Sequence, residues 1–130
     1  MATLTNPQLK ISLVSGSNQA DIEASVGVSL TPFEQFLIAN GLGLSLRCEL
    51  WAADSGFNGG DDLVRVVGTR PTPVSATHTF TMRVPRSALD EDDSIFDDHD
   101  ELYAKMRLRS NQPIFPLDVT VKSPEIGAEF

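Results

Sequence analysis

The residues with the clearest potential for chemistry form an acidic run from Asp90 to Glu101. Eight of these twelve residues are carboxylates, out of 18 Asp and Glu residues in the whole chain. Like charges packed this densely repel one another unless water, salt or a cation separates them. The run is therefore either a solvated loop or part of a cation site.

A second polar segment, 54–62, has the composition of a calcium-binding loop. Asp54, Asn58, Asp61 and Asp62 supply side-chain oxygens, and three glycines between them allow tight turns that expose backbone carbonyls. Calcium takes roughly six to eight oxygen ligands of these kinds. In this respect the segment resembles the calcium loops of C2-type β-sandwiches, which also gather aspartates from separate loops at one end. The resemblance is confined to this clustering of aspartates from separate loops, and no diagnostic motif is shared.

Both acidic segments should lie at the same end of the fold. If successive strands alternate in direction, the connections after the first, third and fifth strands share one end. Twelve of the 18 carboxylates then fall at that end, with Asp21 counted in the first connection. We therefore expect a Ca²⁺ site there. Its candidate ligands are Asp54, Asn58, Asp61, Asp62, Asp90, Asp92 and Asp98.

Other kinds of site match the sequence less well. The run from Asp90 has the acidic spacing of an EF-hand, but Ile95 stands where that loop needs glycine. A catalytic carboxylate pair needs one carboxyl in an apolar setting, which a run of solvated acids seldom provides. His78 falls on the inward register of a predicted strand, so we expect a core histidine with satisfied hydrogen bonds. Cys48 is the single cysteine, and we expect a small buried residue and not a reactive thiol.

The overall composition limits the classes of partner. A net charge of -8 argues against nucleic acid, because phosphate binding needs a basic stripe. No stretch approaches the roughly 18 apolar residues of a membrane span. The first residues lack the basic region and apolar core of a signal peptide, so the cytoplasm is the default location. A chain of 130 residues fits one domain, and we expect 1–130 to form a single β-sandwich.

The elements that must position these residues are mostly strands, because apolar and polar residues alternate along most of the chain. Half-buried strands produce this period of two, since successive side chains point to opposite faces. Several basic residues alternate along these segments, as expected for the solvent face of a sheet. The seven predicted strands cover residues 9–13, 22–30, 42–50, 63–67, 78–84, 102–109 and 115–121.

One short helix is predicted over 32–39. Thr31 provides the cap, proline follows at the first helical position, and Glu34 completes a capping box. Asn40 and the glycine after it supply a stop signal. The apolar residues expected to pack on the sandwich from this helix are Phe33, Phe36 and Leu37.

The alternative to a strand over 102–109 is a helix capped by Ser94. Strict alternation from Leu102 onward favours the strand. The pattern as a whole predicts an all-β fold, a single antiparallel sandwich of about seven strands and of immunoglobulin-like or C2-like size. A jelly roll or an open barrel is the alternative topology. The last residues, 123–130, should form an extended, loosely held tail.

Three functions fit these observations. The first is a non-enzymatic sandwich module, stabilised or gated by calcium at its acidic end, that binds another protein or associates with itself. The second is a structural subunit whose metal-free acidic surface meets a basic partner. The third is a hydrolase that uses the acidic cluster with a metal.

Overall fold

The alternating segments form the strands of two antiparallel sheets. The computed structural model describes residues 2–52, 62–85 and 100–128. Within these ranges the chain has eight strands and one helix. Their bounds are β1 Thr3–Leu13, β2 Gln19–Ser29, α1 Pro32–Ala39, β3 Leu44–Ala52, β4 Asp62–Pro71, β5 Thr77–Pro85, β6 Asp100–Ser110, β7 Asp118–Lys122 and β8 Ile126–Ala128. The predicted all-β sandwich with one short helix is confirmed.

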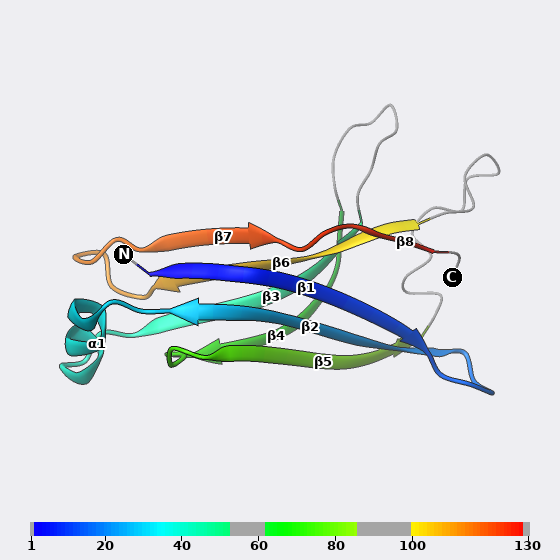
Figure 1. Ribbon diagram of the computed structural model, residues 1–130, viewed down its shortest axis with the longest axis horizontal. Coiled ribbons are helices and arrows are strands. Elements are labelled where there is room, and N and C mark those ends of the chain that lie inside the picture. The colour runs from blue at the N-terminus through cyan, green and yellow to red at the C-terminus, as the bar shows by residue number, and fades with distance from the viewer. Residues whose placement is uncertain (1, 53–61, 86–99, 129–130) are drawn as a thin grey trace, which may run out of the picture.

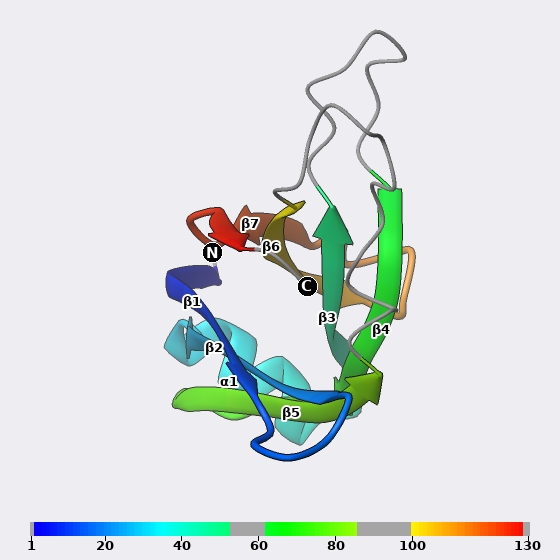
Figure 2. The same cartoon turned by 90° about the vertical axis from the view of Figure 1, so that its right-hand side faces the viewer.

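The two sheets face each other across a single hydrophobic core (Figures 1 and 2). One sheet has three strands in the order β1-β2-β5. The other has β4-β3-β6-β7, with β8 also paired to β6. Every one of these strand pairs is antiparallel. Strands β3 and β6 therefore form the centre of the larger sheet, with β4 on one side and β7 and β8 on the other.

The last predicted strand begins later than expected. Phe115 and Leu117 were both expected in the strand, but they precede β7. The Phe115 N–H donates to the Gln112 carbonyl at 3.1 Å in a turn, and the Leu117 carbonyl accepts from Ser110 N–H at 2.9 Å. Pro116 has no N–H to donate to a strand ladder, so pairing starts only beyond it.

The segment 123–130 contains both an anchored residue and a short strand. Ser123 is buried, and its hydroxyl accepts a hydrogen bond from Ala104 N–H at 2.8 Å. Ile126 pairs with Leu102 at the start of β6 and packs against the core. These contacts bring the end of the described chain alongside the strand that follows the acidic run.

The core is built from the inward-facing residues of the alternating strands. On β3, Leu44, Leu46, Cys48 and Leu50 all have 0% exposure, and Ile22 on β2 has 1%. Cys48 is thus buried, as predicted, and this burial raises the pKa of its thiol to about 12, with a smaller contribution from the charge of Glu49. A thiol in this state has almost no reactive thiolate at neutral pH.

We expect Cys48 to react with a thiol reagent only when the protein unfolds. At pH 8 the native protein should show negligible labelling over the time in which the protein in guanidinium chloride labels fully, because access and ionisation both require opening of the core. Absorbance of the released thiolate of Ellman's reagent measures both rates. Rapid stoichiometric labelling of the native protein would contradict the burial of this residue.

Helix α1 begins and ends where the sequence predicts. The Thr31 hydroxyl accepts from Glu34 N–H at 3.2 Å, and Glu34 Oε1 accepts from Thr31 N–H at 2.9 Å, which forms the expected capping box. The other carboxylate oxygen accepts from Ala2 N–H at 2.8 Å. Glu34 is only 2% exposed, so this acid joins the start of the chain to the helix inside the fold.

The prediction that Phe33 and Phe36 close the core is wrong. Both side chains are 62% exposed, whereas Leu37 packs against the core as expected. The inward stripe of the helix contains Glu34, Leu37 and Ile38, at helical spacing. Because the capping glutamate occupies this stripe, the two phenylalanines lie outside it. Phe33 has an aromatic neighbour in Phe115, whose ring centroid lies 6.4 Å from its own.

Candidate functional site

The strand register brings the borders of the two acidic segments together. Ala52, the last residue of β3, pairs with Asp62 of β4 on one side and with Leu102 of β6 on the other. Ala52 and Asp62 are the described residues on either side of the segment 53–61, and Asp100, two residues before Leu102, is the first described residue after the segment 86–99. The strand directions expected from alternation are confirmed. The borders of both acidic segments therefore lie at one end of the larger sheet, opposite to α1 (Figure 1).

Most of the predicted calcium ligands lie outside the described residues. This applies to Asp54, Asn58, Asp61, Asp90, Asp92 and Asp98. Asp62 is the first residue of β4, where its backbone pairs with Ala52. In the ranges that the structure describes, no group of three His, Cys, Asp or Glu residues could hold a metal ion.

Asp21, which sequence reasoning counted with the acidic end, lies within β2 and already has a counter-ion. Arg83 of β5 contacts both of its carboxylate oxygens, with Nε at 2.7 Å and Nη2 at 3.2 Å. The hydrogen bond and charge of Arg83 lower the pKa of Asp21. This exposed pair ties the two strands together and takes Asp21 out of the set of uncompensated acids.

His78 is a core histidine with both ring nitrogens engaged, as predicted. Its Nδ1 lies 2.9 Å from Arg70 Nη1, and its Nε2 lies 2.8 Å from the Val74 carbonyl oxygen. Arginine only donates, so Nδ1 accepts and Nε2–H donates to the carbonyl. The same guanidinium stacks 4.8 Å from the centroid of the Phe80 ring. This histidine therefore holds the β4–β5 connection in place.

A cluster of basic side chains covers the outer face of the larger sheet. Alternation and register place them on the side away from the core, on three adjacent strands. We call this surface the cationic face. Its basic residues are Arg47 on β3, Lys105, Arg107 and Arg109 on β6, and Lys122 on β7. They are half of the ten Lys and Arg residues in a chain whose net charge is -8.

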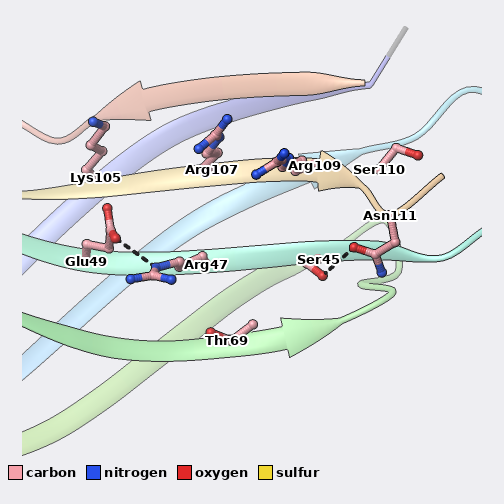
Figure 3. Close-up of a pocket in the computed structure, with 9 residues that line it drawn as sticks. All are labelled: Ser45, Arg47, Glu49, Thr69, Lys105, Arg107, Arg109, Ser110 and Asn111. Atoms are coloured by element: carbon pink, nitrogen blue, oxygen red, sulfur yellow. Dashed lines mark hydrogen bonds and ion pairs between the residues drawn. The ribbon is translucent and has the colours of Figure 1, made fainter. Parts of the chain in front are cut away.

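A groove of about 640 Å³ runs over this face (Figure 3). Every residue that lines it is polar or charged, and the hydroxyl and amide groups of Ser45, Ser110 and Asn111 lie toward one end. Pockets for small molecules are mostly apolar and enclosed. The groove is instead an open, hydrophilic surface. Its lining is Ser45, Arg47, Glu49, Thr69, Lys105, Arg107, Arg109, Ser110 and Asn111.

Two carboxylates neutralise part of this face. Arg47 Nε lies 2.7 Å from Glu49, and Arg107 contacts both oxygens of Asp118, at 2.8 and 2.5 Å. The hydrogen bond and charge of Arg107, with a contribution from the charge of Arg109, lower the pKa of Asp118. Asp118 therefore stays ionised at neutral pH. Two acids against five basic residues leave an excess of positive charge among the described side chains of this face.

Lys105 and Arg109 account for much of that excess. Lys105 Nζ lies 4.7 Å from the ring centroid of Trp51, which in turn donates from Nε1 to Glu49 at 3.1 Å. Among the described side chains, neither Lys105 nor Arg109 forms an ion pair with a carboxylate. Sequence reasoning placed basic residues on the solvent face of a sheet but assigned them no ligand. The available signal was the spacing of 105, 107 and 109 along one strand.

Comparisons with known proteins identify no family. No protein-family model and no curated protein matches the chain. Among solved structures, it is similar to a protein from Bordetella pertussis described as ApaA, with a TM-score of 0.40, 10% identity, and coverage of 99% of this chain and 93% of the other. A second likeness is to β-glucosidase 3B from Thermotoga neapolitana in complex with α-D-glucose, with a TM-score of 0.39, 9% identity, and coverage of 98% of this chain and 17% of the other. At these TM-scores, neither likeness carries an argument about this chain.

Helix α1 has eight residues, and no helix in the described ranges is long and apolar enough to span a membrane.

Proposed function

We propose that the protein is a non-enzymatic β-sandwich module that binds another macromolecule or associates with itself, and that its acidic end binds calcium. The observation that carries the calcium proposal is the pairing of Ala52 with both Asp62 and Leu102. These pairs lie at the borders of both acidic segments, so the proposed site draws its oxygen ligands from two segments that meet the larger sheet at the same end. A site of roughly six to eight oxygens needs such a convergence.

The roles of three described residues support a binding function over an enzymatic one. Glu34, His78 and Cys48 are buried groups of the kinds that enzymes use as acids, bases and nucleophiles. Each has a structural role here. Glu34 caps a helix, His78 holds a connection through both ring nitrogens, and Cys48 packs in the core with a raised thiol pKa.

Calorimetric titration tests the calcium proposal. Calcium added to chelator-treated protein should give a saturable heat with a defined stoichiometry, because a site made of fixed oxygens fills at a definite ratio. The same titration with sodium chloride of equal ionic strength should give only the heat of dilution, since sodium screens charge without being chelated. If millimolar calcium gives no saturable heat, the acidic end is a metal-free surface, and the structural-subunit alternative replaces this proposal.

A further inference from the structure

The cationic face contains like charges in direct opposition. Arg47 of β3 pairs with Arg107 of β6, and Lys105 of β6 pairs with Lys122 of β7. In each pair both side chains point to the same outer face. Like charges directly opposite each other in a sheet are destabilising, and natural pairs favour opposite signs. The same register places Lys105 opposite Glu49 and Arg109 opposite Asp118, so two carboxylates offset part of this charge. Five basic residues against these two acids leave the face with a net positive charge, which an anion from outside can balance.

We propose that the cationic face is a docking surface for an extended, carboxylate-rich segment of a partner protein. The choice of carboxylate follows from charge complementarity and from the ion pairs already on the face. Arg107 contacts both oxygens of Asp118, and Arg47 contacts Glu49. Two guanidinium groups of the cationic face therefore already bind carboxylates. Lys105 and Arg109 flank Arg107 on the same strand, and among the described side chains they have no such partner.

The spacing of the cations matches an extended chain. Residues 105, 107 and 109 alternate along β6, so successive side chains on the face repeat at about 6.7 Å. Alternate side chains of an extended acidic peptide have the same repeat, which lets consecutive carboxylates meet consecutive cations. The groove is lined by Lys105, Arg107 and Arg109 along β6, and Ser45, Ser110 and Asn111 add hydrogen-bonding groups at one end (Figure 3).

The charge of the whole chain makes nucleic acid a poorer occupant. A net charge of -8 repels a polymer that has one negative charge about every 1.7 Å of duplex. A short acidic peptide has a lower charge density, and it contacts only the local positive surface. The proposal gives the proposed binding module a class of partner, and it requires no calcium.

The test is fluorescence anisotropy with a labelled peptide of alternating glutamate and serine, in low-salt buffer with a chelator. The peptide should bind saturably, and a peptide of alternating glutamine and serine should not. The double variant Lys105→Gln/Arg109→Gln should weaken binding about tenfold, because two charge-assisted contacts to the peptide are lost. Its melting temperature should change by no more than about 4 °C, because relief of the repulsion between Lys105 and Lys122 offsets the lost contact of Lys105 with the Trp51 ring.

The matched control for affinity is Lys10→Gln/Arg83→Gln, which removes the same charge from exposed positions on β1 and β5 of the other sheet, although it also breaks the surface pair of Arg83 with Asp21. It should leave the affinity within about twofold of the wild type, since distant exposed charges are screened. The proposal is overturned if the peptide fails to bind, or if both double variants weaken it equally. It is also overturned if a single-stranded oligonucleotide binds the face more tightly than the peptide, or if sedimentation shows salt-sensitive self-association that Lys105→Gln/Arg109→Gln abolishes. Chelator is present throughout, so failure here leaves the calcium titration as a separate test.

Discussion

Replacing Glu34 with alanine is expected to lower the free energy of unfolding by about 3 kcal/mol. The substitution removes the acceptor of three hydrogen-bond donors, which are the N–H groups of Thr31 and Ala2 and the Thr31 hydroxyl. Glu34 and Ala2 are each 2% exposed, so the Ala2 N–H left behind has little access to water, whereas the two Thr31 donors are part-buried. Unsatisfied buried donors cost about 1–3 kcal/mol each, so this loss exceeds that of an ordinary helix cap.

Urea unfolding followed by circular dichroism measures the effect, with two comparison variants. Glu34→Gln keeps one acceptor oxygen and the capping-box geometry, so it should cost only about 1 kcal/mol. Glu23→Ala removes an exposed glutamate from β2 and should change stability by less than about 0.5 kcal/mol. If Glu34→Ala is as mild as Glu23→Ala, the buried carboxylate does not hold the helix to the start of the chain.

The same carboxylate gives a pH signature. Burial raises the pKa of Glu34, but the hydrogen bonds from Thr31 and Ala2 outweigh burial and lower it below the ordinary value of 4.5. The stability that Glu34 contributes is therefore complete above about pH 4.5, and it is lost as the pH falls through the lower, folded-state pKa. A protonated glutamate resembles glutamine, so the stability gap between wild type and Glu34→Gln should narrow under acid. A gap that widens toward low pH would contradict the sign of this shift.

Calcium is expected to raise the melting temperature by several degrees, more than sodium chloride of the same ionic strength. A cation that binds only the folded state stabilises it by RT ln(1 + [L]/Kd), about 2.7 kcal/mol at a hundredfold excess over Kd. Each kcal/mol shifts the melting temperature of a domain of this size by about 4 °C. Differential scanning calorimetry with and without chelator measures the shift. Equal shifts with calcium and with matched sodium chloride would show that the acidic end is only a charged surface.

Variants in the two acidic segments test whether both supply ligands. Asp61→Asn and Asp92→Asn should each reduce the calcium effect, because the proposed site draws oxygens from both segments. Each should also slightly stabilise the metal-free protein by relieving repulsion. Glu23→Asn removes the same charge from the exposed side of β2 and is the matched control. If Asp92→Asn alone matters, the two segments do not share a cation.

The strands and the helix follow from local patterns, and this is why the sequence predicts them. Alternation along 44–52 produces β3 because a strand in a sandwich buries every second side chain. The helix follows from its cap and its proline, which act within one turn. The exposure of Phe33 and Phe36 was missed because hydrophobicity suggested an inward orientation. Their position depends on the contact between Glu34 and Ala2, which are 32 residues apart.

In the candidate site, too, the features that depend on local patterns could be predicted, and those that depend on strand register could not. Alternation of strand directions was enough to bring the borders of the acidic segments to one end, and the pairing of Ala52 bears this out. The sequence alone could not predict that Arg47 and Arg107 lie opposite each other. It depends on the register between β3 and β6, and a shift of one residue would turn one of the two side chains to the other face.

The order of strand pairing also governs how the chain reaches this fold. Strand β2 pairs with β5, as in Ile22 with Met82, and β3 pairs with β6, as in Leu46 with Leu108, so each contact closes a loop of about 60 residues. The two closures interleave along the chain, since β3 lies between β2 and β5 and β5 lies between β3 and β6. Each sheet therefore needs a strand that follows, in sequence, a strand of the other sheet. We therefore expect the sheets to form together in one cooperative step, with folding times of milliseconds to seconds that are typical of domains dominated by distant contacts.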